Sequence, residues 1–289
     1  MTPEVVVVGG ANVDMKARVA APLVAGTSNP GSVVRTPGGV GRNVAENLAR
    51  LGRVVALVST VGNDPDGDWL LEWTATAGVD VAPVLRGGQT GRYVAVLDVH
   101  GDLSVGVSDM ASTEALGPEV LDHDLIRSAT LVVVDGNIPA TTVDAVLALS
   151  ASAGVRVVID PVSVAKSRRI APLLRTERPV FAITPNEDEL AALGSVAGLH
   201  RRGVEVVWVR RGAAGSTLST AADLVELEAP HVDPVDVTGA GDAMLAAFCH
   251  RVLAGDDLET AARAGHEAAA LTVASPHTVR PDLHAMMTP

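Results

Sequence analysis

The chain has 289 residues, which at about 150 residues per domain is enough for one large domain with a core that needs no disulfide staples. Hydrophobic residues make up 47% and aromatic residues only 2%, which excludes a disordered chain and argues against stacking on single-stranded nucleic acid. The 22 basic and 34 acidic residues give a net charge of −12, so a nucleic-acid partner is disfavoured and any anionic ligand needs a local binding device.

Short apolar runs alternate with helical patterns along the chain. Val5–Val8 is a β-branched run closed by two glycines, which predicts a buried strand. Val44, Leu48 and Leu51 recur at helical spacing and predict a helix. The alternation continues with a strand at 54–61, a strand at 131–134 before a helix at 142–153, a strand at 155–159 before a helix at 165–174, and a strand at 180–183 before a helix at 187–199. This order predicts an α/β fold with a mostly parallel sheet covered by helices on both faces.

Two segments break the alternation. Residues 15–36 are polar and carry glycine and proline, and residues 91–107 read as two strands joined around residues 100–102, which predicts an antiparallel hairpin. We expect the two segments to form a small β lid beside the main sheet. Because the chain shows no repeat, low-complexity tract or linker, we expect residues 1–289 to form a single domain.

Cys249 is the only cysteine, which excludes an internal disulfide framework and fits a reducing compartment. The N-terminal residues lack the basic region of a signal peptide. No apolar run approaches the roughly 18 residues needed to span a bilayer. These features predict a cytoplasmic protein that does not bind membranes.

Several common phosphate-binding motifs are absent. The sequence contains no G-x-x-x-x-G-K-[ST], which excludes a P-loop, and it lacks the protein-kinase motifs. Gly39 and Gly41 begin a G-x-G pattern, but Val44 stands where the dinucleotide fingerprint needs a third glycine.

Residues 236–242 (DVTGAGD) precede an apolar stretch typical of a helix. Two glycines at a helix start let the backbone approach a ligand and direct free N–H groups at it, which makes an anion hole without lysine. Asp242 in the first helical turn can accept a proton from a substrate hydroxyl. The alternative is that Asp242 only caps the helix.

Residues 9–14 (GGANVD), 37–45 (PGGVGRNVA) and 236–242 together resemble the signatures of the ribokinase-like (PfkB) carbohydrate and nucleoside kinases. The resemblance extends over essentially the whole chain and implies a three-layer ribokinase-like sandwich with a small β lid. It also implies that ATP and Mg²⁺ are used, that Asp242 is the catalytic base, and that the backbone of Gly239, Ala240 and Gly241 forms the anion hole.

Asn12 and Asp14 follow the first strand, at the end of the sheet where α/β proteins bind ligands. An amide and a carboxylate can bind the vicinal hydroxyls of a ribose, although both residue types are also common turn formers. The resemblance implies a similar substrate-binding role for Gly38, Gly39 and Asn43.

Asn186 and Glu189 lie three residues apart on one helical face. In the family such a pair holds Mg²⁺, largely through water, and the nucleotide phosphates. The same spacing also forms a capping box, and both interpretations can hold together.

The resemblance implies further contacts with ATP and a cation. It places Arg210 beside the phosphates, Gly212 and Gly215 in a turn against the nucleotide, and His266 at the adenine pocket, although a lone histidine is more often structural. Asp236 stands where the family often holds a monovalent cation such as K⁺.

Loop segments at 28–31, 108–110, 135–139 and 160–163 resemble those of family members that act on pseudouridine, and Asn137 is the expected ribose or base contact. We therefore expect an ATP-dependent kinase that phosphorylates the 5′-hydroxyl of pseudouridine. The alternatives are a kinase of the same family acting on ribose, adenosine or another sugar or nucleoside, and a non-catalytic nucleoside-binding protein. The lid also offers a surface for a homodimer.

Overall fold

The computed structural model describes residues 2–287. The strands of its central sheet are β1 (Val5–Val8), β4 (Val55–Val58), β6 (Val79–Asp80), β10 (Leu131–Asp135), β11 (Arg156–Asp160), β12 (Val180–Ile183), β13 (Val204–Arg210), β14 (Ser216–Ser219) and β15 (Leu224–Leu227). They are arranged in the order β15-β14-β13-β12-β11-β10-β1-β4-β6. The neighbours from β13 to β6 pair in parallel, whereas β14 and β15 pair antiparallel at one edge.

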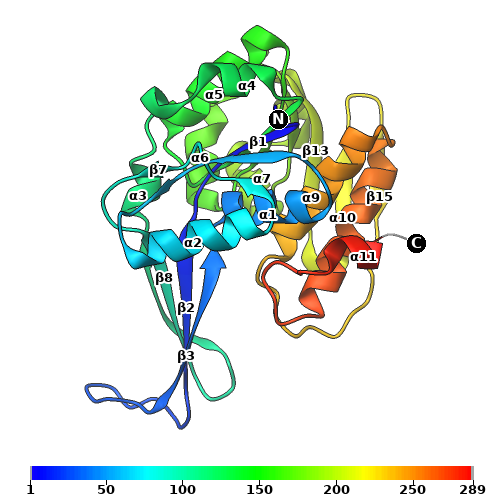
Figure 1. Ribbon diagram of the computed structural model, residues 1–289. Coiled ribbons are helices and arrows are strands. Elements are labelled where there is room, and N and C mark those ends of the chain that lie inside the picture. The colour runs from blue at the N-terminus through cyan, green and yellow to red at the C-terminus, as the bar shows by residue number, and fades with distance from the viewer. Residues whose placement is uncertain (1, 288–289) are drawn as a thin grey trace.

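Helices cover both faces of this sheet, as Figure 1 shows. One face carries α1 (Val40–Arg50), α2 (Pro65–Thr76), α9 (Ala240–Ala254) and α10 (Leu258–Val273), with α11 (Leu283–Met287) packed on their outer side. The other carries α4 (His123–Ser128), α5 (Ala140–Ala153), α6 (Val164–Ile170), α7 (Glu187–Leu193) and α8 (Val196–Arg201). The predicted α/β fold with a mostly parallel, doubly covered sheet is confirmed.

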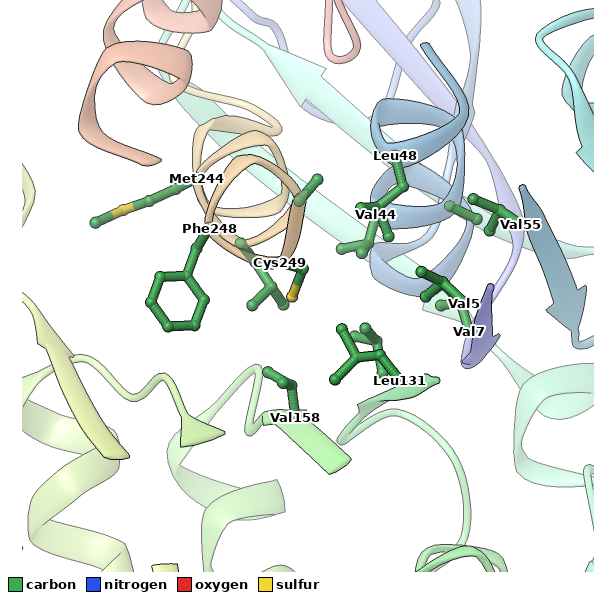
Figure 2. Close-up of a cluster of buried hydrophobic side chains, with 14 of the residues drawn as sticks. Val5, Val7, Val44, Leu48, Val55, Leu131, Val158, Met244, Phe248 and Cys249 are labelled. Carbon is green, nitrogen blue, oxygen red and sulfur yellow. The ribbon is translucent and has the colours of Figure 1, made fainter. Parts of the chain in front are cut away.

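The four valines of β1 explain why both faces need covering. Successive side chains of a strand point to opposite faces, so Val5 and Val7 join one apolar cluster and Val6 and Val8 the other. In the first cluster, side chains of α1 and α9 point toward those of the strands (Figure 2). This packing fixes the two helices side by side, with their N-termini at the carboxyl end of the sheet.

A second, four-stranded sheet projects from the body of the molecule (Figure 1). Its strands are β2 (Asn12–Val19), β3 (Gly31–Gly38), β8 (Gly91–Leu97) and β9 (Leu103–Asp109), in the order β3-β2-β8-β9. The expected hairpin is β8 and β9, which pair antiparallel, and β2 pairs antiparallel with β3 and parallel with β8. We call these four strands the small sheet. The remaining short elements are α3 (Ala111–Glu114) and the paired strands β5 (Thr60–Val61) and β7 (Leu85–Arg86).

Some predicted boundaries are wrong for local reasons. The helix expected at 187–199 is two helices, because Gly194 has a φ of 122° and Ser195 caps a new helix. The strand expected at 54–61 is divided into β4 and β5, and the helix expected at 165–174 ends at Ile170 with a 3₁₀ turn after it. The sheet edge β13–β15 and helices α2 and α10 lie outside the predicted elements. Much of the buried face of α10 is alanine, which gives a weak helical pattern in the sequence.

Within residues 2–287, no helix has both the length and the apolar character that crossing a bilayer requires.

Candidate active site

A pocket of about 540 Å³ lies where the carboxyl ends of β1, β10 and β11 meet the small sheet and the N-termini of α1 and α9. Its volume is in the range typical of small-molecule sites. Seven of the residues selected from the sequence line it, namely Asn12, Asp14, Gly39, Asn43, Asn137, Gly239 and Asp242. The fold therefore brings into one cavity residues from four separate stretches of the chain.

Asp242 lies in the first turn of α9 with its carboxylate almost fully buried. Burial raises its pKa to about 7; a hydrogen bond from Asn43 opposes this rise, and the nearby Asp160 charge adds to it. A carboxylate with a pKa near neutrality is well suited to accept a proton at physiological pH. No side chain caps α9, so helix capping does not account for Asp242.

Asn43 is oriented toward Asp242 by a buried arginine. The Arg42 guanidinium, fully buried, donates to Asn43 Oδ1 and to Glu46. With its oxygen engaged, Asn43 directs Nδ2 to Asp242 Oδ2 at 2.7 Å. Arg42 is a positioning residue that sequence reasoning missed, although it belongs to the quoted 37–45 signature.

The N-terminus of α9 presents free backbone donors beside Asp242. Gly239 has a φ of 81°, and a Cβ there would lie 2.0 Å from Thr278 O, so only glycine fits. Within residues 2–287, the N–H groups of Gly239 and Gly241 donate to no acceptor, while that of Ala240 donates to Val237 O at 3.3 Å. Donors directed outward from a helix N-terminus suit an anion such as a phosphoryl group.

Asn12 and Asp14 lie on one face of β2 because alternate residues of a strand share a face. Asn12 Nδ2 donates to Asp14 Oδ1 at 2.6 Å, and a Cβ at Gly38 on the paired strand would lie 2.3 Å from Asp14 Oδ2. Gly38 thus leaves room for the carboxylate and lies beside the pocket, outside its lining. Burial raises the pKa of Asp14, and the Asn12 hydrogen bond opposes this rise.

Asp135 at the end of β10 connects three segments of the site: the loop after β1, the first turn of α1 and the loop after β10. Its buried carboxylate accepts from the N–H groups of Gly10 at 2.8 Å, Gly41 at 2.6 Å and Asn137 at 2.8 Å. A Cβ at Gly9 would lie 2.5 Å from Asp135 Oδ2, so the glycines of both N-terminal signatures make room for this carboxylate. Burial raises the pKa of Asp135, opposed by these hydrogen bonds.

The pocket is also lined by cationic and polar groups that sequence reasoning missed. Lys166 and Arg169 of α6 line it, with Lys166 Nζ bonded to Asn137 Oδ1 and Arg169 bonded to Gly136 O. Thr113 also lines it, and its buried Oγ1 has no hydrogen-bond partner among the described residues. Lys166 could have been singled out from the sequence because only two of the 22 basic residues are lysines.

Val162 in the pocket wall has a φ of 66°, an unusual value for a β-branched residue. Its N–H donates to Asp160 Oδ1 at 2.9 Å, which holds the loop after β11 in place. Strained backbone of this kind persists where the surroundings fix it, and it is concentrated at functional sites.

Asn186 and Glu189 form the capping box considered above, at the N-terminus of α7. Asn186 Oδ1 accepts from Glu189 N at 2.8 Å, and Glu189 Oε2 accepts from Asn186 N at 2.9 Å. Burial and the Asp160 charge raise the pKa of Glu189, with the Asn186 hydrogen bond acting in the opposite direction. The side-chain oxygens of Asn186 and Glu189 are ligands that suit Mg²⁺, a hard cation that keeps several waters. Burial destabilises the ionised form of Glu189, and a bound cation would offset this. Within residues 2–287, no group of three or more Asp, Glu, His or Cys side chains is arranged to hold a metal ion by itself.

Arg210 is held against these carboxylates. It donates to Asp160 Oδ2 at 3.1 Å and Oδ1 at 3.2 Å, and its guanidinium lies 3.9 Å from Glu189. A Cβ on Gly241 would lie 2.9 Å from Arg210 Nη1, so this cation also borders the N-terminus of α9. Its predicted place beside phosphates is compatible with that position.

None of the predicted nucleotide-binding residues belongs to the pocket lining, namely Asn186, Glu189, Arg210, Gly212, Gly215 and His266. Gly212 and Gly215 flank the turn between β13 and β14, where a Cβ on Gly215 would lie 2.0 Å from Leu227 O. His266 is buried, with Nε2 2.7 Å from Ser216 Oγ, which in turn accepts from Trp208 Nε1 at 2.8 Å. These contacts give His266 a packing role, and its role at adenine stays a prediction.

Asp236 lies beside the α9 N-terminus and is already paired with a cation. Lys16 Nζ is 2.5 Å from Asp236 Oδ2, and the N–H of Thr238 donates to Oδ1 at 2.9 Å. An ammonium group therefore stands where a monovalent metal ion was expected.

Known proteins match this chain over nearly its whole length. The chain matches the pfkB family carbohydrate kinases over residues 2–285. It is 31% identical over 296 residues to the pseudouridine kinase of Escherichia coli (strain K12), covering 96% of this chain and 93% of that protein. It is also 29% identical to the ribokinase of Bacillus subtilis (strain 168), covering 83% and 82%.

Among solved structures, that of Arabidopsis thaliana ribokinase complexed with ribose and ATP matches with a TM-score of 0.83 and 26% identity, covering 99% of both chains. The chain belongs to the pfkB family of carbohydrate kinases. It is a ribokinase-fold phosphotransferase with an alcohol acceptor, of an ATP-dependent family.

Proposed function

We propose that this protein transfers the terminal phosphoryl group of ATP to the 5′-hydroxyl of pseudouridine. The observation that carries the proposal is Asp242, a buried carboxylate with a pKa of about 7 that faces the pocket beside free backbone donors. A protein that only bound a nucleoside would gain nothing from burying an ionisable group there.

The proposed reaction uses groups already in place. The 5′-hydroxyl oxygen attacks the terminal phosphorus while its proton passes to Asp242, and the bond from that phosphorus to the bridging oxygen breaks, releasing ADP. The free N–H groups of Gly239 and Gly241 stabilise the negative charge of the phosphoryl group in transit. Asn43 holds the Asp242 carboxylate through its 2.7 Å hydrogen bond, so the base is oriented before substrate binds.

Asn186 and Glu189 would hold Mg²⁺ through water, and Arg210 lies between them and the α9 N-terminus. When bound, the metal neutralises part of the triphosphate charge. Arg210 pairs with Asp160 and lies 3.9 Å from Glu189, so one cationic side chain faces two carboxyl groups at this position.

Two kinds of polar group in the pocket support a nucleoside as the acceptor. Asn12 and Asp14 can bind vicinal ribose hydroxyls, while Lys166, Arg169 and the unpartnered Thr113 hydroxyl also line the pocket. These hydrogen-bond donors suit the carbonyl oxygens of a uracil-type base. Similarity to the Escherichia coli pseudouridine kinase supports the same acceptor.

The first alternative is another family substrate, such as ribose, adenosine or a further sugar or nucleoside, and the ribokinase relatives make ribose the leading competitor. The second is a non-catalytic nucleoside-binding protein. The pKa of Asp242, about 7, suits proton transfer and argues against a protein that only binds.

We expect kcat/KM for pseudouridine to exceed that for uridine by at least about 10-fold, or about 1.4 kcal/mol. Pseudouridine exposes an additional ring N–H, and Glu114 lines the pocket as an available acceptor; a site built for that donor leaves its acceptor unpaired when uridine binds. ADP release should be measured with pseudouridine, uridine, ribose and adenosine under identical conditions. Equal or faster turnover of another acceptor would exclude pseudouridine as the preferred substrate but would still support a kinase. No turnover of any acceptor would favour a binding protein.

We also propose that two copies associate through the small sheet. Val33, Leu103 and Val107 on its outer strands are 63%, 58% and 58% exposed, although large apolar side chains are normally covered. We expect sedimentation to give a dimer that Val107→Asp shifts to monomer. A wild-type protein that is monomeric at micromolar concentration would contradict this proposal.

A further inference from the structure

A charged contact connects the small sheet to the loop before α9. Lys16 of β2 places Nζ 2.5 Å from Asp236 Oδ2 and 3.2 Å from Thr238 Oγ1. Thr238 in turn donates its N–H to Asp236 Oδ1 at 2.9 Å. Residues 236–238 lead directly into Gly239, so this ammonium group holds the segment that positions the free donors of α9.

Both oxygens of Asp236 are used by these contacts. Oδ2 accepts from the ammonium group and Oδ1 from a backbone N–H. A monovalent metal ion bound to this carboxylate would have to displace Lys16 or lie against its positive charge. The residues present therefore do not fit the monovalent cation that was expected at Asp236.

The position of Lys16 along its strand adds a second connection. Asn12, Asp14 and Lys16 alternate along β2 and share one face. The strand that carries the proposed sugar-binding pair thus also carries the charge that holds the α9 loop. Movement of the small sheet and placement of the α9 donors are linked through one side chain.

We infer that Lys16 is a positioning residue that supplies, from within the chain, the positive charge at Asp236, so that turnover requires no added monovalent metal ion. This inference rests on the proposed kinase function. Lys16 and Asp236 are 30% and 27% exposed, and ion pairs this open to solvent contribute little to overall stability. Loss of the Lys16–Asp236 ion pair should therefore change the turnover rate more than the stability of the folded protein.

The test compares the wild-type protein, Lys16→Met and Arg18→Met in KCl and in tetramethylammonium chloride at equal ionic strength. Arg18 is a matched control because it is an exposed cation on the same strand that bonds Val99 O instead of the α9 loop. We expect wild type and Arg18→Met to turn over equally in both salts. Lys16→Met should lose about 10-fold in kcat in tetramethylammonium chloride, with KM for the nucleoside little changed, and should regain several-fold in KCl.

A second readout needs no turnover. Without nucleotide, KCl should raise the Tm of Lys16→Met by about 2 °C relative to tetramethylammonium chloride, because K⁺ can occupy the vacated place beside Asp236. The wild-type Tm should not differ between the salts. Stimulation of wild-type turnover by KCl, or a wild-type kcat in Lys16→Met, would overturn the inference. If no acceptor is phosphorylated, the kinase proposal fails, while the Tm comparison still decides whether Lys16 supplies this charge.

Discussion

Asp242→Asn is expected to lower kcat by about 10²- to 10⁴-fold, the usual contribution of a general base. The amide cannot take the proton of the 5′-hydroxyl, yet it has nearly the same shape and can still accept from Asn43 Nδ2 through its oxygen. Nucleoside affinity should therefore change little, which binding measurements without ATP would show. Near-normal turnover in this variant would rule out Asp242 as the base.

The pH dependence provides an independent check of the same residue. Asp242 has a pKa of about 7, so kcat/KM should fall roughly tenfold per pH unit below that value and level off above it, because only the ionised carboxylate accepts a proton. The residual activity of Asp242→Asn should lack this acid limb.

Protein stability should respond in the opposite direction to activity. The pKa of Asp242 rises from 3.8 to about 7 on folding, so the folded state binds more protons between these values and loses stability as pH rises through that window. Asp242→Asn removes the buried charge, and its Tm at pH 8 should equal or exceed that of wild type. A marked fall in Tm would mean that lost activity reflects lost structure.

Asp14→Ala is expected to weaken nucleoside binding by about 1.5–3 kcal/mol, or roughly 10- to 150-fold. The Asp14 carboxylate is held by Asn12 at 2.6 Å and lies in the space left by Gly38, so its remaining lone pairs can accept from ribose hydroxyls in the ground state. Because this contact precedes the transition state, the loss should appear mainly in the dissociation constant for the nucleoside, measured by calorimetry.

Two comparisons separate this interpretation from a general disturbance of the site. ATP affinity of Asp14→Ala should match that of wild type, and Asp14→Asn, which retains one acceptor oxygen, should lose less than the alanine variant. A variant that binds nucleoside normally and loses ATP would show that the two ligand positions have been exchanged.

Local sequence patterns were sufficient for the main architecture. The four valines of β1 have no polar alternate, so the strand had to be buried on both faces, and parallel strands joined by helices follow from that alternation. The glycine-rich signature at 236–242 also located the N-terminus of α9, because a φ of 81° at Gly239 excludes most other residues. Such constraints act within a few residues and are therefore readable from the sequence.

Similar local patterns nevertheless led to different structures. Asn186 and Glu189 form the capping box that their spacing suggests, whereas Asp242, in the first turn of its own helix, makes no cap and is held by Asn43, 199 residues away in the chain. Which hydrogen-bond donor a first-turn carboxylate meets depends on the neighbouring element.

The sequence by itself determined the fold class, the family and the glycine-rich start of α9. Only the tertiary structure decided that Asp135 connects three segments of the site, that Lys166 lines the pocket, and that Lys16 pairs with Asp236. These side chains belong to elements distant in sequence, and their partners are fixed by how the sheet, the small sheet and the helices pack. A buried charge is stable only where that packing provides a partner or hydrogen bonds, so its role cannot be read from its neighbours in the chain.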